Sequence, residues 1–236
     1  MKISLVVPVY NEEKIIRETI LSVKDYMEKN FADYEIIFVN DGSSDNTEKI
    51  ASELSGGNLK LISYEQNKGK GGAVKTGMLA ALGDVIFYTD ADLAYGTGVI
   101  LEGYKIFEED KEADLVIGSR KKHKDGYESY TLIRKIMSFV FYLVLKIYGG
   151  LQQSDSQSGI KGFRSKAAKK IFGLCQTDGW SFDFEVLKLA EKLKYKTAEM
   201  PVKIINHRES KIKPGDSIKM LREISVIKKR IKNLNL

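Results

Sequence analysis

The chain has 236 residues, of which 43% are hydrophobic, and carries a formal net charge of +6. This length can bury one large α/β core, so we expect a single domain over residues 1–236. The single cysteine, Cys175, excludes an intramolecular disulfide and is typical of a reducing compartment such as the cytoplasm. The apolar start, Ile3–Val9, contains Pro8 and is followed by acidic residues, which predicts a strand rather than a signal peptide.

The positive charge is concentrated at the C-terminal end. Residues 211–236 hold eight Lys or Arg and two acidic residues, so this segment alone accounts for the +6 and the rest is neutral in sum. A neutral body with a basic tail argues against a nucleic-acid groove and favours a local contact with an anionic surface, such as a membrane. The alternative is a solvated helix that aids solubility.

Strand and helix patterns alternate along the first half of the chain, which predicts a doubly wound, mostly parallel α/β sheet. Asn11 is expected to cap the first helix, Asp45 and Glu48 have capping-box spacing for the second, and Gly69–Gly72 opens the third. The expected strands are Ile3–Val9, Tyr34–Asn40, Leu59–Tyr64, Asp84–Thr89 and Leu115–Ser119.

Two carboxylates directly follow the fourth expected strand. Asp90 and Asp92 are separated by one small residue at the edge where open α/β sheets bind ligands. Hard ions such as Mg²⁺ or Mn²⁺ take oxygen ligands and are shared with substrate phosphates. The pair therefore predicts a metal site that serves a nucleotide diphosphate. The alternative is that both residues only cap a turn or the next helix.

Other polar loops are expected at the same rim. Pro8–Glu13 follows the first strand and Asn40–Asp45 the second, and they place Glu12 and Asp41 where a base and a ribose could be hydrogen-bonded. Asn67–Ala73 adds flexible backbone and two lysines at a helix start, which is favourable to anions. The chain lacks P-loop spacing and has no G-x-G-x-x-G after the first strand, which argues against P-loop NTPases and dinucleotide dehydrogenases.

A short apolar segment occurs at Ile136–Leu145, where nine apolar residues and Ser138 lie between Lys135 and Lys146. A transmembrane helix needs about 20 apolar residues, so this segment is expected either in the membrane interface or in the core. No transmembrane anchor is expected, so attachment would be peripheral or assisted by an anchoring partner protein. The basic tail is a second membrane candidate, with apolar residues at helical spacing: Ile218, Leu221, Ile224, Ile227 and Ile231.

Several segments carry a family resemblance. They are Val7–Glu13, Asp41–Asp45, Asn67–Ala73, Asp90–Leu93, Gly118–Arg120, Asp155–Gly159, Gly179–Glu185 and Pro201–Val202. In this order they resemble the motifs of family 2 GT-A glycosyltransferases that load sugars onto polyprenyl phosphates. The second half is more similar to the dolichyl-phosphate glucosyltransferase branch than to the mannosyltransferase branch.

The resemblance implies one GT-A α/β catalytic domain with appended C-terminal amphipathic helices. Residues 1–120 would bind the nucleotide, 121–210 would form the acceptor side, and 211–236 would be the basic amphipathic tail. The implied activity is metal-dependent, inverting transfer of a hexose from UDP-glucose or GDP-mannose to polyprenyl or dolichyl phosphate, with glucose favoured. Mg²⁺ or Mn²⁺ would be the cofactor. The protein would work peripherally on the cytoplasmic face of a membrane, with residues 136–145 in the interface.

The resemblance also assigns nucleotide-side residues. Asp92 would be the direct metal ligand, and Asp90 would contact the metal shell or the ribose. Gln often follows the second Asp by two residues in the mannosyltransferase branch; Ala94 stands there, so an extra water would complete the metal shell. Trp180 would stack on the sugar, with a core position as the alternative. The residues expected around the nucleotide sugar are Pro8, Tyr10, Glu12, Asp41, Lys70, Asp90 and Trp180.

The acceptor side needs charge neutralisation more than a strong base. A lipid monophosphate has a second pKa of about 6, so its oxygen is already nucleophilic at neutral pH. Repulsion between the two anionic substrates is the main obstacle, which a metal and arginines reduce. Arg120, Arg134 and Arg208 are the candidates, with a surface role as the alternative for each. Asp155 would orient the sugar or acceptor, or act as a base.

Two other functions stay open. The first is a family 2 transferase with a soluble or glycan acceptor, whose first half would look the same. The second is a nucleotide-sugar-binding or scaffold protein at the membrane, without turnover. The intact carboxylates of Asp41, Asp90 and Asp92 argue against the second function, whereas Ala94 keeps it open.

Overall fold

The computed structural model describes residues 1–128, 130, 132–206 and 214–234. Its centre is a seven-stranded sheet in the order β3-β2-β1-β4-β6-β5-β7. Among these strands only β6 runs antiparallel to its neighbours, so the expected mostly parallel α/β sheet is confirmed. The strands are β1 (Ile3–Val9), β2 (Tyr34–Asp41), β3 (Leu59–Tyr64), β4 (Val85–Thr89), β5 (Leu115–Ser119), β6 (Ile160–Arg164) and β7 (Thr197–Pro201).

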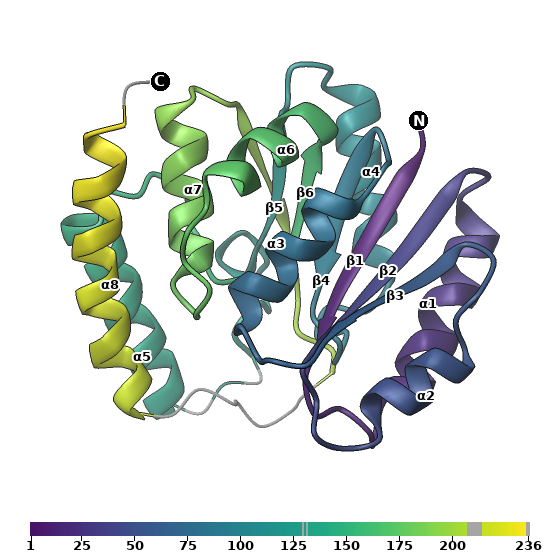
Figure 1. The fold of residues 1–236 in the computed structure, drawn as a ribbon. Coiled ribbons are helices and arrows are strands. Elements are labelled where there is room, and N and C mark those ends of the chain that lie inside the picture. Colours follow the sequence, from purple (N-terminus) through teal and green to yellow (C-terminus); the bar gives the residue numbers. More distant parts are fainter. Residues whose placement is uncertain (129, 131, 207–213, 235–236) are drawn as a thin grey trace.

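Helices cover both faces of the sheet (Figure 1). The first face carries α1 (Ile16–Asn30), α2 (Thr47–Glu53) and α4 (Gly98–Glu109). The second face carries α3 (Lys70–Ala80), α6 (Ser165–Leu174) and α7 (Phe182–Lys192). Beyond α7 lie α8 (Pro214–Lys232) and α5 (Leu132–Leu143), which the π-helical turn η2 (Val144–Tyr148) continues; a 3-10 turn, η1 (Arg120–Lys122), follows β5.

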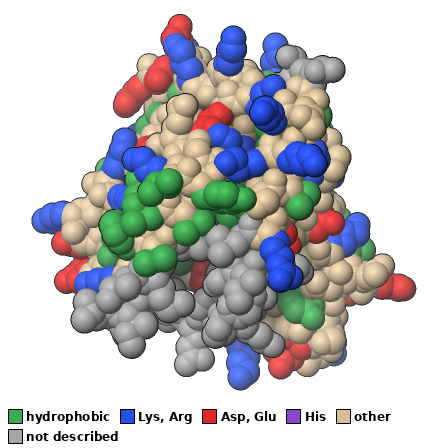
Figure 2. All heavy atoms as spheres, turned by 90° about the vertical axis from the view of Figure 1, so that its left-hand side faces the viewer, with side chains coloured by type: hydrophobic (Ala, Val, Ile, Leu, Met, Phe, Trp, Pro, Cys, Tyr) green, Lys and Arg blue, Asp and Glu red, His purple; other side chains and the backbone are tan. Residues whose placement is uncertain are grey.

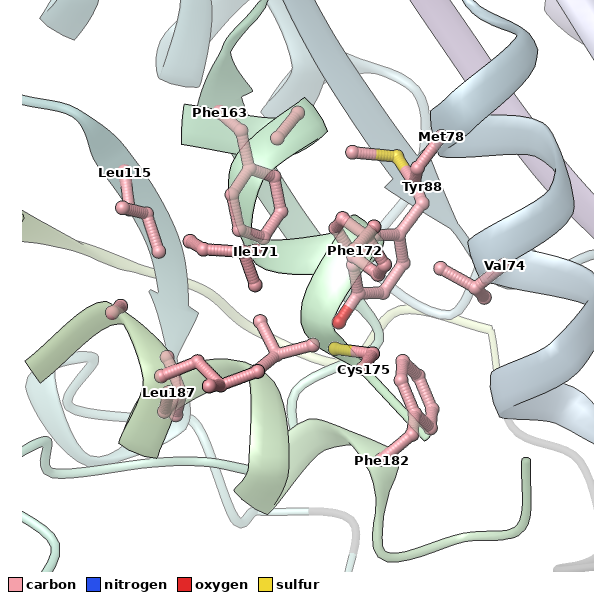
Figure 3. Close-up of a cluster of buried hydrophobic side chains, with 14 of the residues drawn as sticks. Val74, Met78, Tyr88, Leu115, Phe163, Ile171, Phe172, Cys175, Phe182 and Leu187 are labelled. Carbon is pink, nitrogen blue, oxygen red and sulfur yellow. The ribbon is translucent and has the colours of Figure 1, made fainter. Parts of the chain in front are cut away.

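The core has one hydrophobic cluster on each side of the sheet. On the first side the apolar stripe predicted for the first helix is fully buried, with Ile16, Ile20, Val23 and Met27 at 0% exposure. On the second side α3, α6 and α7 pack around Tyr88 of β4, as Figure 3 shows. Burial raises the pKa of the Cys175 thiol in this cluster to about 12, so this cysteine fills the core as a neutral thiol.

The sequence pattern indicated neither β6 nor β7, and β6 changes the order of the sheet. β6 comes from the segment expected to form the acceptor side, yet it lies between β4 and β5 and pairs antiparallel with both. β5 therefore has no contact with β4 in the sheet; its other neighbour is β7, with Leu115 opposite Thr197. One continuous sheet thus contains strands from both halves of the chain.

Two predicted helix caps are wrong. Asn11 does not cap the first helix, because α1 begins at Ile16; Asn11 has a φ of +51° and its side-chain oxygen accepts a hydrogen bond from the Ser44 amide at 2.8 Å. Asparagine tolerates this left-handed backbone better than most residues. At α2, Asp45 accepts from the Thr47 amide, but Glu48 bonds the Asn40 side chain at 3.2 Å, so the capping box does not form.

The apolar stripe of the basic tail is part of the core, which corrects its assignment to a membrane surface. Ile224, Ile227 and Ile231 of α8 are at most 4% exposed and pack in the same cluster as α7. The side chains of Ile218 and Leu221 lie outside the described residues. Along residues 222–232 the side of α8 that faces away from this cluster is mostly polar, with Val226 as an exposed apolar residue.

Candidate active site

The loops after β1 and β2 meet at one rim of the sheet, at the lower edge of Figure 1. The Asn11 amide donates to Ser43 Oγ at 3.0 Å, the Glu12 amide donates to Thr47 Oγ1 at 2.7 Å, and the Glu13 amide donates to Asp45. The predicted convergence of these loops is therefore confirmed. Three of the residues expected around the nucleotide sugar differ in exposure here: Pro8 and Glu12 are half-buried and Tyr10 is 43% exposed.

Asp41 organises the loop between β3 and α3. Its carboxylate is 3% exposed and accepts four hydrogen bonds, from the Tyr64 hydroxyl, the Asn67 side chain and the amides of Lys68 and Gly69, at 2.7–3.0 Å. Burial and this bond to Asp41 raise the pKa of Tyr64, which keeps its hydroxyl protonated as a donor. The carboxylate expected to hold the base and ribose is thus already satisfied by its own chain, and it fixes the lysine- and glycine-rich loop.

The glycines of this loop permit a very close backbone contact. Gly69 has a φ of +93°, and a Cβ there would lie 2.6 Å from the Asp178 carbonyl oxygen. The amides of Gly71 and Gly72 donate to the same oxygen at 2.7 and 3.3 Å. Two of the amides expected to favour an anion at the start of α3 are therefore bound by the loop before α7, which holds Trp180 over this helix end.

Lys70 and Asp90 join α3 to the end of β4. Lys70 Nζ lies 2.6 Å from Asp90 Oδ1 and 5.6 Å from the centre of the Trp180 ring. Burial opposes the positive charge, but the attraction of Asp90, Asp183 and Asp92 outweighs it and raises the pKa of Lys70. Half-buried Trp180 therefore stands beside a permanently charged ammonium and an acidic turn.

The turn that carries Asp92 is hydrogen-bonded to the segment that follows β7. Asp92 Oδ1 accepts from the Ala94 amide at 3.1 Å, and Leu93 has a φ of +47°. The Asn206 side chain donates to the Leu93 carbonyl at 2.9 Å, and the Ile205 amide donates to the Ala94 carbonyl at 2.8 Å. These bonds fix the acidic turn to the segment that follows β7.

A buried charge cluster that the sequence pattern did not predict lies beneath the rim. Lys161 of β6 is fully buried, with its Nζ 2.6 Å from Asp183 Oδ1 and 2.8 Å from the Ser158 carbonyl oxygen. The Tyr88 hydroxyl donates to the same Asp183 oxygen at 2.5 Å, and burial followed by Asp183 raises the pKa of Tyr88. A lysine within a strand between buried apolar residues was the available signal, because such a charge requires a partner.

Arg120 and Asp155 form a bidentate ion pair beside the same rim. Arg120 Nε and Nη2 each lie 2.7 Å from an Asp155 oxygen, and the Arg120 amide donates to Oδ2 at 3.0 Å. Arg120 Nη1 also donates to the Tyr130 hydroxyl oxygen at 2.8 Å. Burial opposes the charge of Asp155, but Arg120 outweighs it and holds the pKa of that carboxyl below its ordinary value. This geometry favours an orienting role for Asp155 over a base.

The structure does not describe the side chains of the other two candidate arginines. Arg134 belongs to α5, but its side chain lies outside the described residues. Arg208 falls within 207–213, which is also outside them.

The acidic turn has the donor chemistry of a site that a nucleotide completes. Within residues 1–128, 130, 132–206 and 214–234, no three His, Cys, Asp or Glu side chains gather into a ready-made metal cage. Asp90 and Asp92 supply carboxylate oxygens from one turn, and Asp183 adds to the negative field around Lys70. Mg²⁺ is usually held by one or two carboxylates together with waters and substrate phosphates. The residues present therefore fit Mg²⁺ or Mn²⁺ arriving with a diphosphate.

Comparison with known proteins assigns the family. Residues 4–172 match the model "Glycosyl transferase family 2". The chain is 36% identical to dolichyl-phosphate beta-glucosyltransferase ALG5D of Trichomonas vaginalis, over 92% of this chain and 70% of that protein. It is 33% identical to the UDP-N-acetylglucosamine–dolichyl-phosphate N-acetylglucosaminyltransferase of Methanococcus voltae, over 86% of this chain and 85% of that protein.

A solved structure shares the fold. It is glucosyl-3-phosphoglycerate synthase from Mycobacterium tuberculosis in complex with Mn²⁺, UDP and glucosyl-3-phosphoglycerate, with a TM-score of 0.68 at 20% identity over 98% of this chain and 79% of that one. The fold is thus the GT-A fold, and the family model over residues 4–172 makes the chain a glycosyltransferase. The chain belongs to glycosyl transferase family 2 and is similar to dolichyl-phosphate glucosyltransferases in particular.

Proposed function

We propose that this protein transfers glucose from UDP-glucose to a polyprenyl phosphate of the dolichyl type. The observation that carries the proposal is the convergence of Lys70, Asp90, Asp92 and Trp180 at the rim of a family 2 glycosyltransferase fold. The similarity to dolichyl-phosphate beta-glucosyltransferases over most of the chain supports the acceptor and the sugar.

Each residue at the rim has a different role in binding the nucleotide-sugar donor. Asp92 and Asp90 would hold Mg²⁺ or Mn²⁺, which when bound supplies positive charge to the departing diphosphate. Lys70 attracts the same diphosphate from the start of α3, and its ion pair with Asp90 keeps the ammonium pointed at the acidic turn. Trp180 offers an aromatic face for the sugar. Asp41 acts indirectly, because it fixes the loop that leads to Lys70.

The acceptor side needs orientation rather than proton removal. The phosphate of the lipid is largely dianionic at neutral pH, so its oxygen can attack the sugar carbon without a strong base while the bond to UDP breaks. Inversion of configuration is what the family resemblance implies. Arg120, held by Asp155, keeps a positive charge next to the rim at all physiological pH values. Arg134 on α5 and Arg208 after β7 are our further candidates for neutralising the acceptor phosphate.

Work at a membrane surface is supported by one face of the molecule. Five large hydrophobic side chains of α5, η2 and α8 are at least half exposed; this apolar patch is Phe139, Val140, Ile147, Tyr148 and Val226. Figure 2 shows hydrophobic side chains gathered on this face with Lys and Arg side chains nearby. Leu145, in contrast, is 3% exposed, so the apolar segment around α5 serves both the core and the surface.

The helices of the structure also bear on how the protein could contact a membrane. No helix among the described residues has both the length and the apolar composition needed to cross a bilayer. The proposed contact of the apolar patch is therefore with the interface, where an amphipathic element lies along the surface.

Radiolabelled donor tests the activity directly. With detergent-solubilised polyprenyl phosphate, label should appear in a chloroform-extractable product; label in a water-soluble product would indicate a soluble or glycan acceptor, and no product would indicate binding without turnover. A thermal-shift panel of UDP-glucose, UDP-N-acetylglucosamine and GDP-mannose with Mn²⁺ tests the donor, because a selective ligand stabilises the folded state. The relative from Methanococcus voltae is the reason to include UDP-N-acetylglucosamine.

A further inference from the structure

A basic cleft opens where η2, α7 and α8 meet, directly beside the apolar patch. Its volume is about 660 Å³, and Tyr148 of the patch forms part of its wall. Five lysines and one glutamate line it: Lys188, Lys192, Lys228, Lys229, Lys232 and Glu191. The cleft therefore combines a net positive lining with an adjoining apolar surface.

Two of the lysines hold the walls of the cleft together. Lys188 pairs with Glu191 and also donates to the Gly150 carbonyl oxygen at 2.9 Å. Lys228 donates to the Tyr148 carbonyl oxygen, and the Tyr148 hydroxyl lies 2.7 Å from Ser225 Oγ, so η2 is fastened to α8. These contacts give the cleft a defined shape rather than that of a loose surface groove.

The other three lysines supply charge in excess of what the fold uses. Lys192, Lys229 and Lys232 are exposed, and within the part of the chain that the structure describes no acidic side chain forms an ion pair with them. They stand in the last turns of α7 and α8, where cations are favoured by about 0.3–1 kcal/mol each. That preference accounts for lysines at two helix ends, but not for three free ammonium groups facing one cleft.

We infer that this cleft binds the anionic phosphate headgroup of a membrane lipid. The inference rests on the proposed function, because it assumes that the apolar patch faces a bilayer. Patch and cleft together match a lipid surface: the exposed side chains of Ile147 and Tyr148 enter the acyl boundary while the lysines meet the phosphates. A soluble anion would use the lysines and leave the patch exposed to water.

The headgroup in this cleft is distinct from the acceptor phosphate. Trp180 and Asp183 stand at the start of α7, whereas Lys188 and Lys192 stand towards its end. At 1.5 Å per residue, Lys188 and Lys192 stand about 8 and 14 Å along the helix from Asp183, so the cleft lies further along α7 than the catalytic rim. The cleft therefore selects and orients the surface on which the protein works, and leaves the catalytic rim to the substrate lipid.

Co-sedimentation with vesicles tests this inference. The full chain should bind vesicles of phosphatidylcholine and phosphatidylglycerol more tightly than vesicles of phosphatidylcholine alone. The cleft variant Lys192→Gln/Lys229→Gln/Lys232→Gln should lose roughly 100-fold of that binding, since each lysine near an anionic surface contributes about a factor of five. It should keep its melting temperature and its transfer to detergent-solubilised acceptor.

A matched variant removes the same charge from other parts of the surface. Lys49, Lys105 and Lys111 are exposed and belong to α2, α4 and the loop after α4, far along the chain and the sheet from the cleft. Lys49→Gln/Lys105→Gln/Lys111→Gln should bind the anionic vesicles as the parent protein does, because charges beyond a Debye length of about 8–10 Å are largely screened. An equal loss in both variants would overturn the inference in favour of diffuse attraction.

Three further outcomes distinguish a lipid from a soluble anion in the cleft, and the cleft inference from the proposed activity. Tight binding of inorganic phosphate that the cleft variant loses, with vesicle binding unchanged, would assign the cleft to a soluble anion and overturn the lipid inference. A parent protein that transfers no sugar yet binds anionic vesicles through these lysines would overturn the proposed activity and support the cleft. An active protein whose vesicle binding does not depend on these lysines would overturn the inference about the cleft and leave the proposed activity standing.

Discussion

Lys70 and Asp90 face each other across the catalytic rim, with 2.6 Å between Lys70 Nζ and Asp90 Oδ1. The ammonium comes from the first residue of α3 and the carboxylate from the residue after β4, so two separate motifs of the sequence meet in this one ion pair. In the resting enzyme Lys70 therefore neutralises part of the acidic turn that a divalent ion would share.

This ion pair predicts opposite effects of Lys70→Gln on metal binding and on catalysis. Without the ammonium, Mn²⁺ should bind the protein alone more tightly, because it no longer competes with a fixed cation beside Asp90. Transfer should nevertheless fall by on the order of 100-fold, since the diphosphate loses one of its positive partners. Mn²⁺ titration calorimetry and the radiolabel assay measure the two effects, with exposed Lys49→Gln as the control. Unchanged Mn²⁺ affinity would count against this role.

Asp92→Asn should abolish most of the transfer activity while leaving the fold intact. The substitution removes a charge that helps neutralise the leaving diphosphate, an effect worth several kcal/mol, so turnover should drop by on the order of a hundredfold or more. The melting curve should change little. Asp33→Asn, with a side chain 70% exposed, is the matched control. Turnover of Asp92→Asn near that of the parent protein with Mn²⁺ present, or turnover of the parent protein that a chelator leaves unchanged, would contradict the metal role.

The sequence predicted the strands of the first half well because each is a buried apolar run. β1, β3 and β5 have the predicted bounds, and β2 and β4 differ by one residue. β6 could not be predicted in this way. Its sequence contains Lys161, Gly162 and Arg164, and the charge of Lys161 becomes acceptable only through Asp183, which lies 22 residues further along the chain. Local patterns carry no information on such a distant partner.

The candidate site likewise has features that the local sequence predicts and features that depend on distant residues. Order and spacing predicted that Asp41 and Asp90 would lie at one rim, because parallel strands place their carboxyl ends together. The sequence did not show that Asp41 would be saturated by its own chain, nor that Arg120 and Asp155, 35 residues apart, would bind each other. Each of these depends on side-chain geometry between separate loops, and a linear pattern does not specify that geometry.

The Arg120–Asp155 pair should make stability depend on pH at its acid end. The pKa of Asp155 is lowered in the folded protein, so the unfolded chain binds its proton first as the pH falls. The stabilisation is fully present above the ordinary aspartate pKa of about 3.9 and is lost as the pH falls below it. Asp155→Asn should unfold about 3 kcal/mol more easily at neutral pH, because it leaves the buried guanidinium without its counter-charge.

Denaturant melts between pH 3 and pH 7 measure this effect. The difference in unfolding free energy between the parent protein and Asp155→Asn should shrink towards the acid end. Asp33→Asn provides an exposed carboxylate for comparison and should run parallel to the parent protein. A difference that stays constant over the whole range would show that Asp155 stabilises the fold by shape rather than by charge.

Arg230 of α8 should hold the nucleotide-side loop through Glu185. Glu185 is fully buried, pairs with Arg230, and accepts from the amides of Gln176 and Thr177 at 2.9 and 2.7 Å. Arg230→Met should therefore cost about 3 kcal/mol of stability by leaving a buried carboxylate without its cation. Because the same loop meets the start of α3, the KM for the nucleotide sugar should also rise. The exposed neighbour substitution Lys229→Met should change neither quantity.

The apolar patch predicts that membrane binding and folding can be separated within one apolar segment. Phe139 and Val140 are 56% and 53% exposed, whereas Leu145 is 3% exposed. Phe139→Ser/Val140→Ser should lower binding to vesicles by at least about tenfold, since two large apolar side chains no longer enter the acyl boundary. Its melting temperature should stay near that of the parent protein, because neither side chain leaves a packed core.

Leu145→Ala is the counterpart in the same segment and should behave in the opposite way. Removing a buried leucine costs roughly 2–5 kcal/mol through lost burial and the cavity that remains, so the melting temperature should fall. At a temperature where this variant is still folded, its vesicle binding should equal that of the parent protein. Co-sedimentation and melting curves on the same samples give both readouts. If Phe139→Ser/Val140→Ser lost stability instead, its side chains would be packing inside the protein, and the membrane contact would have to come from the lysines of α7 and α8 alone.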